Sequence, residues 1–290
     1  LICSDECDPC GDYCKPLLLG FIQPTDPNWA NFISPMTNPV FFEDPRTLTE
    51  ARFIFIDHQL PALAGGAIPS SRLQVLAVQL RAAITEDLSI IAAKDGFIWP
   101  TALAPLDDGW ADVALGLKYN VWKDCCCQKI LSIGVTFELP VGSTRSLQGN
   151  GDGEFNLFAA YGAAFGDCNH FLTTAGFRLP TDRAAENQVF YWSGHLDRQL
   201  NGSCFYGFVE ANWFHWMSNG AVAAFDGIQG GDFFNFGSTG VAGSDIVTGA
   251  LGLKYKPSLL NEIGLAYEIP LTNERGVLQH RFTADYILRY

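Results

Sequence analysis

The C-terminal stretch of the chain, residues 277–290, alternates between apolar and polar side chains almost without interruption. One face carries Leu278, His280, Phe282, Ala284, Tyr286, Leu288 and Tyr290, and the other carries Gln279, Arg281, Thr283 and Asp285, with Ile287 as the one apolar exception. Successive side chains of a β-strand point to opposite faces, so this pattern predicts a strand with one apolar face and one polar face. Many such strands in one chain are typical of a transmembrane β-barrel.

The same alternation recurs through most of the chain from residue 48 onward. It predicts twelve strands, at residues 48–60, 71–84, 88–99, 109–122, 128–139, 154–165, 170–179, 187–197, 203–216, 245–256, 261–269 and 277–290. Closed bacterial barrels have an even number of antiparallel strands, and each spanning strand needs about 9–11 residues. The sequence has no run of about 18 apolar residues, so a transmembrane helix is not expected.

The connections between the predicted strands alternate strictly between two lengths. Short connections lie at residues 85–87, 124–128, 166–169, 199–202 and 256–260, and longer ones lie at residues 61–70, 100–108, 140–153, 180–186, 218–244 and 270–276. Outer-membrane barrels have short turns on the periplasmic side and longer loops on the outside. The alternation therefore predicts strands that run up and down in hairpins.

A proline follows the upward strands at nearly constant intervals. Pro61, Pro100, Pro140 and Pro180 are spaced by 39, 40 and 40 residues, and Pro270 follows a later strand. Proline cannot extend a hydrogen-bonded ladder, so it marks where pairing stops. A period near 40 also occurs in propeller blades of four short strands. Because each unit here holds two long strands, a barrel fits the repeat better than a propeller does.

The polar faces of the predicted strands differ from those of a soluble β-sandwich. Only 17% of the residues are charged, compared with about 25% in soluble domains. Glycine and alanine fill much of the polar face, for example at Gly116, Gly134 and Gly252, which suits a confined lumen. Aromatic residues gather at both ends of the strands, as in the two aromatic belts of membrane barrels. The net charge of −13 argues against a nucleic-acid partner.

All nine cysteines are predicted to lie on the short-turn side of the barrel. They are Cys3, Cys7, Cys10, Cys14, Cys125, Cys126, Cys127, Cys168 and Cys204. The first four belong to residues 1–46, which show little alternation, and the others lie in or beside short turns. Because the periplasm permits disulfides, we expect the N-terminal segment to be stapled to these turns as a cap or plug. An odd number of cysteines leaves at least one unpaired or paired between chains.

Signals for metal binding and catalysis are weaker. The N-terminal spacing C-x3-C-x2-C-x3-C leaves a metal or iron–sulfur site as an alternative, but most zinc sites use paired C-x2-C. Residues 150–154 resemble a fragment of a calcium loop without the remaining oxygen positions. His280 falls on the lipid-facing side, with no serine of matching depth to act as its nucleophile. We therefore expect no metal, no cofactor and no enzymatic activity.

Charged residues on the inward faces of the predicted strands are candidates for lining a solute path. They are Arg81, Lys94, Asp112, Lys118, Glu138, Arg178, Glu210, Lys254, Glu268, Arg281 and Asp285. Such charges tune which ions or solutes cross a water-filled pore. Alternatively, they pair across strands and fill the lumen. Lys254 and Glu262 fall nearly opposite each other across a short turn, so both roles stay open.

The longest loop, residues 218–244, is rich in glycine and phenylalanine and contains Phe233-Phe234-Asn235-Phe236-Gly237. Two arrangements are predicted for it. The loop either presents a contact surface outside the barrel or folds inward and constricts the mouth. Two arrangements are also predicted for residues 1–46 at the other end of the barrel. A plug that fills the lumen favours an anchor, and a cap that leaves the lumen open favours a channel.

Three stretches of sequence carry a resemblance to known proteins. They are Phe41-Phe42-Glu43-Asp44-Pro45-Arg46 leading into Leu48-Thr49-Glu50-Ala51-Arg52, Asp245-Ile246-Val247 followed by Gly249-Ala250-Leu251-Gly252-Leu253-Lys254-Tyr255, and the final Ile287-Leu288-Arg289-Tyr290. Together they resemble uncharacterised outer-membrane β-barrels of planctomycete-type bacteria. More distantly, the chain is similar to barrels associated with phenol degradation and to long-chain fatty-acid transporters. The resemblance covers residues 38–290 and implies passive uptake of small, in part hydrophobic, molecules.

The sequence thus predicts an all-β protein that consists of a closed antiparallel transmembrane β-barrel of about twelve strands. The barrel is expected at residues 47–290, with a Cys-rich N-terminal cap or plug at residues 1–46. The expected location is the bacterial outer membrane, with the N-terminus and the short turns in the periplasm. The chain begins at Leu1 instead of methionine, which fits removal of a signal peptide.

The expected function is passive passage of small solutes. The alternative is a plugged barrel that serves as a structural anchor or as an interaction protein through its extracellular loops. Expected partners are outer-membrane lipid and small solutes. A homo-oligomer or an envelope protein is a further expectation at the periplasmic Cys-rich face.

Overall fold

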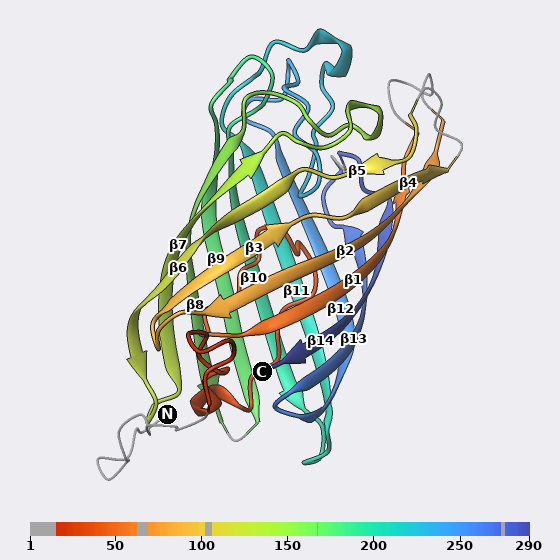
Figure 1. The fold of residues 1–290 in the computed structure, drawn as a ribbon. Helices are drawn as coiled ribbons and strands as arrows, with labels where there is room; N and C mark the ends of the chain where they lie inside the picture. The colour runs from red at the N-terminus through yellow and green to blue at the C-terminus, as the bar shows by residue number, and fades with distance from the viewer. Residues whose placement is uncertain (1–15, 63–68, 102–105, 167, 274–275) are drawn as a thin grey trace.

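The strands form one closed antiparallel barrel (Figure 1). The computed structural model describes residues 16–62, 69–101, 106–166, 168–273 and 276–290. Strand order around the barrel follows the sequence, and β1 closes the ring by pairing with both β2 and β14. The strands are β1 Glu50–Leu60, β2 Ser71–Ala83, β3 Leu88–Lys94, β4 Phe97–Thr101, β5 Gly109–Trp110, β6 Val113–Asp124, β7 Lys129–Leu139, β8 Glu154–Phe165, β9 Asn169–Pro180, β10 Val189–Gln199, β11 Phe205–Trp216, β12 Asp245–Ser258, β13 Asn261–Pro270 and β14 His280–Arg289.

These segments make twelve passes along the barrel, because two passes are interrupted. The third pass consists of β3 and β4, and the fourth consists of β5 and β6. At the first break, Gly96 adopts a φ of +127°, a conformation that favours glycine. The backbone amide of Val78, which faces the break, donates to the carboxylate of Asp95 at 2.8 Å. The prediction of a closed twelve-stranded antiparallel barrel is confirmed, and a sandwich or a propeller is excluded.

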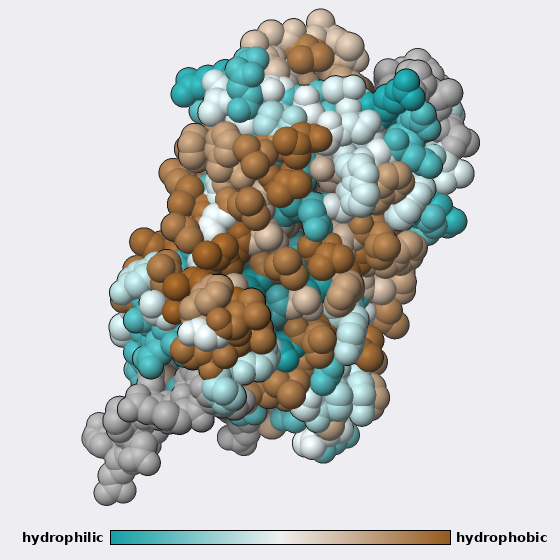
Figure 2. All heavy atoms as spheres, in the orientation of Figure 1, coloured by the Kyte–Doolittle hydropathy of each residue, from teal (hydrophilic) through white to brown (hydrophobic). Residues whose placement is uncertain are grey.

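The barrel has an apolar outer face and a polar inner face. In β14, Phe282, Tyr286 and Leu288 are exposed on the outside, whereas Arg281 and Asp285 are buried inside. Figure 2 shows hydrophobic residues covering most of the middle of the wall, with hydrophilic residues at its two ends. The predicted alternation is therefore confirmed within the strand. It fails only at residues 277–279, which precede the strand and still belong to the loop.

The connections divide the barrel into two ends (Figure 1). At the short-turn end lie the connections that follow β2, β6, β8, β10 and β12, together with the C-terminus. At the long-loop end lie the connections that follow β1, β4, β7, β9, β11 and β13. The predicted alternation of short and long connections therefore agrees with the described strands.

Helical structure is limited to three short 3-10 helices among the described residues. They are η1 Pro27–Trp29, η3 Thr144–Ser146 and η4 Ala223–Phe225. None of the helices in this part of the chain is long and apolar enough to span a membrane. That result does not bear on spanning by strands.

Residues 24–49, called the inner segment below, run inside the barrel before β1 begins. Trp29, Phe32, Ile33 and Met36 are completely buried there. Polar groups of the segment contact strands on several sides of the barrel, including β2, β10, β11 and β13. A segment that touches opposite walls lies within the lumen, as the trace through the barrel in Figure 1 also shows.

Candidate functional site

The lumen is lined by buried charges that pair with one another. All eleven predicted pore-lining residues are buried: Arg81, Lys94, Asp112, Lys118, Glu138, Arg178, Glu210, Lys254, Glu268, Arg281 and Asp285. Each takes part in an ion pair or in a histidine–carboxylate contact. The alternation on the strands explains their inward position. Pairing across strands is found for some of them, such as Lys254 with Glu262 at 3.3 Å. Others pair with the inner segment or the longest loop, as Lys118 does with Glu43 and Arg281 with Asp232. A role in lining a solute path stays a prediction.

Glu210 on β11 is the main hydrogen-bond acceptor for the middle of the inner segment. Its carboxylate accepts the backbone N–H groups of Met36 at 2.8 Å and Thr37 at 2.6 Å. It also accepts the Thr37 hydroxyl at 2.5 Å. Two adjacent backbone amides on one carboxylate fix the direction of the chain as well as its position. Nearby, the side-chain amide of Asn38 donates to the hydroxyl of Ser193 at 2.9 Å.

Glu43 of the inner segment joins two nearby strands of the barrel wall, β2 and β6. Its carboxylate lies 2.6 Å from Arg81 on β2 and 2.8 Å from Lys118 on β6. Burial by itself would raise the pKa of Glu43, but the two cations outweigh burial and lower that pKa from 4.5 to about 2. Glu43 is therefore ionised at neutral pH and holds the inner segment between two strands that do not pair with each other.

A second charged network lies near the short-turn end. Arg289 on β14 contacts Glu50 at 2.8 Å and Glu262 at 2.6 Å. Asp285 joins Arg52 and Lys254 at 2.8 and 3.0 Å. Among these residues, Arg52, Glu50 and Arg289 were not predicted to line the lumen, whereas Glu262 was expected opposite Lys254. The signal that could have found Arg289 is its place on the same face of the last strand as Arg281 and Asp285.

Histidines and carboxylates form a chain along β9, β10 and β11. A ring nitrogen of His170 lies 2.7 Å from Asp197, and the other oxygen of Asp197 lies 3.1 Å from His195. The second ring nitrogen of His195 lies 2.7 Å from Glu210. The chain thus connects the short-turn end, where His170 borders a surface pocket, with the residue that holds Thr37. No role was predicted from the sequence for His170, His195 or Asp197.

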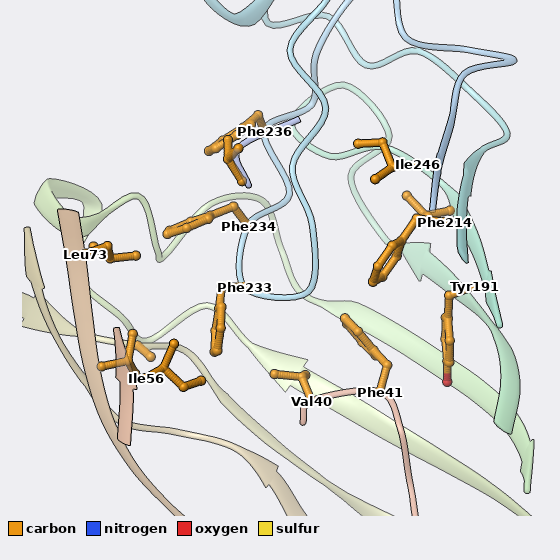
Figure 3. Packing of buried hydrophobic residues seen from close by; sticks show 14 of the residues in the cluster. Val40, Phe41, Ile56, Leu73, Tyr191, Phe214, Phe233, Phe234, Phe236 and Ile246 are labelled. Carbon is orange, nitrogen blue, oxygen red and sulfur yellow. The ribbon is translucent and has the colours of Figure 1, made fainter. Parts of the chain in front are cut away.

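The longest loop folds inward and closes the other end of the lumen. Phe233, Phe234 and Phe236 are buried in one apolar cluster with Phe41 of the inner segment and Phe214 of the wall (Figure 3). The rings of Phe234 and Phe236 stack with centroids 5.6 Å apart. Of the two predicted arrangements of the loop, the inward one is therefore confirmed.

Two arginines of the wall fix the tip of this loop. Arg281 forms a bidentate pair with Asp232, both bonds being 2.7 Å long. Arg178 donates to the carbonyl oxygen of Gly231 at 2.7 Å. The guanidinium group of Arg281 also lies over the ring of Phe233, 5.1 Å from its centre. That of Arg178 lies over the ring of Phe41, 4.6 Å from its centre. Each arginine thus combines a polar contact with a cation–π contact.

Little space remains between the inner segment and the loop tip. One cavity of about 20 Å³ lies between Asn38, Glu268 and Arg281. Another, of about 10 Å³, lies between Val40, Gln79 and Phe233. A single water molecule needs about 10–15 Å³ of such space, so neither cavity admits an organic solute. The lumen is closed at this level in the described structure.

The cysteines agree with the predictions only in part. Cys125 and Cys127 are disulfide-bonded. Cys168 and Cys204 are free thiols, so the prediction that they staple the N-terminal segment is wrong. The inner segment borders the same surface pocket as Cys168, but residues 24–49 contain no cysteine that could pair with it. Cys3, Cys7, Cys10 and Cys14 lie outside the described residues, and so do the metal site considered as an alternative and the first 15 residues of the predicted cap.

Other sequence motifs find structural explanations. Residues 150–154 resemble a fragment of a calcium loop, and their last member, Glu154, pairs with Arg178 at 2.7 Å. The carboxylate of Glu154 therefore already binds a cation of the protein. His280 lies beside Tyr267, with ring centroids 5.9 Å apart, at the long-loop rim. Within the described ranges, no group of three or more His, Cys, Asp or Glu side chains is placed to hold a metal ion.

Comparisons with known proteins agree with the barrel fold. No family model matches the chain, and no curated protein matches its sequence. A solved outer membrane channel from Pseudomonas putida F1 is similar, with a TM-score of 0.61 and 12% identity over 89% of this chain and 100% of the channel. The NanC porin has a TM-score of 0.49 and 10% identity over 83% of this chain and 99% of the porin.

The likeness to the Pseudomonas channel shows the fold. At this level of identity it does not show a shared family. The resemblance to planctomycete-type barrels therefore holds for the architecture alone, and the finer family remains a prediction.

Proposed function

We propose that this protein is a bacterial outer-membrane channel for small solutes, apolar ones among them, and that the structure represents its closed state. The single observation that carries the proposal is how the lumen is filled. The wall is a complete twelve-stranded ring, and the material that closes it belongs to the inner segment and the loop tip. Both are continuous with the ends of strands, so both can move without breaking a strand pair.

The outer surface supports placement in a membrane. Leu115, Leu117 and Leu251 are between 47% and 66% exposed in the middle of the wall, where water would disfavour them. Trp99 and Trp110 lie toward the long-loop end and Tyr119 and Trp122 toward the short-turn end, all exposed. Two belts of amphipathic rings around an apolar band fit the two interfaces of a bilayer.

The strand number and the lining of the lumen suggest a class of solute. A twelve-stranded barrel is narrower than porins of 16–18 strands, which hold open aqueous channels. At the long-loop end the loop tip fills the barrel with phenylalanine rings that pack against Phe41 and Phe214. An apolar solute could take over these ring contacts when the loop moves. Farther in, the paired charges would favour small solutes with a polar group.

The fold likeness adds support, because the similar solved structure from Pseudomonas putida is described as an outer membrane channel. By analogy with such barrels, the short-turn end would face the periplasm and the long loops the outside. Residues 1–46 would act as the plug of the barrel at residues 47–290. The predicted pairing of the N-terminal cysteines with Cys125 and Cys127, and the predicted oligomer or envelope partner, belong to the same proposal.

Efflux from vesicles tests the proposal. Vesicles that contain the refolded protein are loaded with solutes of graded size, including a matched polar and apolar pair, and release is followed over time. We expect release of the small solutes above that of protein-free vesicles, faster release of the apolar member, and retention of large dextrans. Release equal to that of protein-free vesicles for every solute, from protein shown to be inserted, would contradict a channel.

A second function, an anchor with a permanently filled barrel, is favoured by the number of buried ion pairs around the inner segment. Glu43 alone makes two, and Asp44 pairs with Arg46 at 2.6 Å. Breaking a buried pair by removing one partner costs about 3–5 kcal/mol. The anchor therefore becomes the better description if the vesicles retain all solutes.

A further inference from the structure

A short apolar arm precedes the inner segment at the short-turn end. It comprises residues 16–22, with the sequence Pro-Leu-Leu-Leu-Gly-Phe-Ile, and contains no charged residue. Its backbone forms a tight turn in which Leu18 and Ile22 exchange two hydrogen bonds of 2.9 and 3.0 Å. Leu19 and Gly20 have positive φ angles of 54° and 82° at the tip of the turn. The arm is thus an ordered turn with its own hydrogen bonds.

The barrel holds this arm at its start, Pro16, and through Gln23 and Thr25, which follow it. The backbone amide of Gln23 donates to the carbonyl oxygen of Ala83 at the end of β2, at 2.8 Å. The backbone amide of Thr25 donates to the carbonyl oxygen of Tyr290 at 2.6 Å. The hydroxyl of Tyr290 donates to the carbonyl oxygen of Pro16 at 2.5 Å. The position of the arm is therefore set by the ends of the barrel strands.

Held in this way, the arm presents its large apolar side chains to the outside. Leu19 is 77% exposed and Phe21 58% exposed, and Leu17 and Leu18 are exposed beside them. The arm appears in red beside the C-terminus in Figure 1, and the surface at this place in Figure 2 is largely hydrophobic. Apolar side chains gathered on an ordered turn call for an apolar surrounding.

A groove of about 440 Å³ separates the arm from the outer wall of the barrel. Leu18 and Ile22 line one side, and Leu80, Ala82 and Leu288 line the other. Leu80 and Leu288 are the exposed, outward-facing residues of β2 and β14. The groove is therefore continuous with the apolar outer face of the barrel.

From this arrangement we infer that the arm is a lipid-docking element: residues 17–21 insert into the membrane, and a phospholipid acyl chain occupies the groove between the arm and the wall. The inference rests on the proposed membrane location. Hydrogen bonds within the turn pair the backbone groups of Leu18 and Ile22 and the N–H groups of Gly20 and Phe21, which lowers the cost of placing this backbone in lipid. The absence of charge on the arm fits the acyl region better than the headgroups. Since the arm leads directly into the inner segment, lipid also anchors the start of the plug.

Photo-crosslinking in vesicles tests this inference. The crosslinking residue p-benzoylphenylalanine is placed singly at Leu19 on the arm, at Leu80 on the wall or at Ala242, which is exposed on the longest loop. The full-length protein is inserted into phosphatidylethanolamine–phosphatidylglycerol vesicles and irradiated, and adducts are identified by mass spectrometry. We expect phospholipid adducts at Leu19 and Leu80 and none at Ala242.

The outcomes distinguish a failure of the inference about the arm from a failure of the proposed membrane location. Lipid adducts at Leu80 without adducts at Leu19 would overturn the inference while leaving the barrel in the membrane. Absence of adducts at both positions would contradict the membrane location itself. Adducts of Leu19 with a second copy of the chain would overturn lipid as the occupant in favour of a dimer contact.

A second measurement avoids the bulky crosslinker. Packing does not protect the arm, because its tip is exposed in the structure, so resistance to chymotrypsin in vesicles would come from lipid. We expect the wild-type arm to resist cleavage and the variant Leu19→Asp, which carries a charge at the tip, to be cleaved at least several-fold faster. Rapid and equal cleavage of both proteins would overturn the inference.

Discussion

Thr37 of the inner segment and Glu210 of the barrel wall, separated by 173 positions in the chain, are joined by two hydrogen bonds. Both the backbone amide and the hydroxyl of Thr37 donate to one carboxylate oxygen of Glu210, at 2.6 and 2.5 Å. The other oxygen accepts from Met36 and faces His195. One wall carboxylate thus holds two consecutive residues of the segment that fills the lumen.

Neutralising this carboxylate should loosen the inner segment. In the variant Glu210→Gln, the hydrogen bonds from Met36 and Thr37 lose their charged acceptor, and each such bond contributes about 1.5–3 kcal/mol. Hydrogen–deuterium exchange of residues 33–41 should accelerate by at least tenfold while the strands stay protected. The control is Asp107→Asn, which removes an exposed ion pair with Arg145 at the rim. Unchanged exchange in Glu210→Gln would show that other contacts hold the segment.

Removing rings from the loop tip should open the long-loop end. The double variant Phe233→Ala and Phe234→Ala deletes two buried side chains from the cluster shown in Figure 3. Large-to-small changes of this kind cost about 3–5 kcal/mol each, so the loop should detach from the wall. Proteolysis within residues 226–238 should become faster than in the wild type.

The matched control for the loop is Met217→Ala, which alters an exposed side chain of the same loop. It should leave the proteolysis rate unchanged. Equal rates in the double variant and the wild type would mean that Asp232 and the backbone contacts alone hold the loop in place.

The environment of Glu186, in the loop between β9 and β10, predicts that the stability of this loop falls at alkaline pH. Burial, reinforced by the neighbouring carboxylate of Glu154, raises the pKa of Glu186 from 4.5 to about 8. Because the folded pKa is the higher one, the protonated form stabilises the loop. That stability is fully present below pH 4.5 and is lost as the pH rises through about 8.

Proteolysis of residues 181–188 should therefore become faster between pH 7 and pH 9. In Glu186→Gln the side chain does not titrate, so the rate should stay flat over this range after correction for the protease. A pH profile identical to that of the wild type would exclude Glu186 as the titrating group.

The free thiols offer a test of orientation. Cys204 is exposed at the short-turn end, which the proposal places in the periplasm. A membrane-impermeant maleimide should leave Cys204 unlabelled in intact cells and label it after the outer membrane is permeabilised. A cysteine introduced by Ala242→Cys at the long-loop end should be labelled in intact cells. The reverse pattern at these two sites would invert the orientation.

The sequence predicts the strands of the barrel wall far better than the segments that fill the lumen. Alternation is a local property, and it places Arg281, Asp285 and Lys254 inside because each strand must turn one face to the lumen. The interruption of the third pass beside Gly96 could not be predicted from the sequence. One inserted residue reverses which side chains of a strand point inward, and it leaves the composition of the strand unchanged.

The path of the inner segment could not be predicted from local pattern. Its position depends on contacts between residues far apart in the chain, such as Thr37 with Glu210 and Ser34 with Glu262. The inward fold of Phe233 depends in the same way on Arg281, 48 positions later in the chain. Phenylalanine-rich loops can equally bind a partner, so the loop sequence alone leaves both arrangements open.

Single-channel conductance in a planar bilayer tests the central claim most directly, namely that the lumen is a channel closed by two segments that can move. The wild type is compared with a variant that combines Glu210→Gln, Phe233→Ala and Phe234→Ala, after both are shown to be folded and inserted. We predict rare, brief openings of the wild type and frequent, stable conductance steps of the variant. A variant that stays as silent as protein-free bilayers would contradict the channel and leave the filled barrel as an anchor.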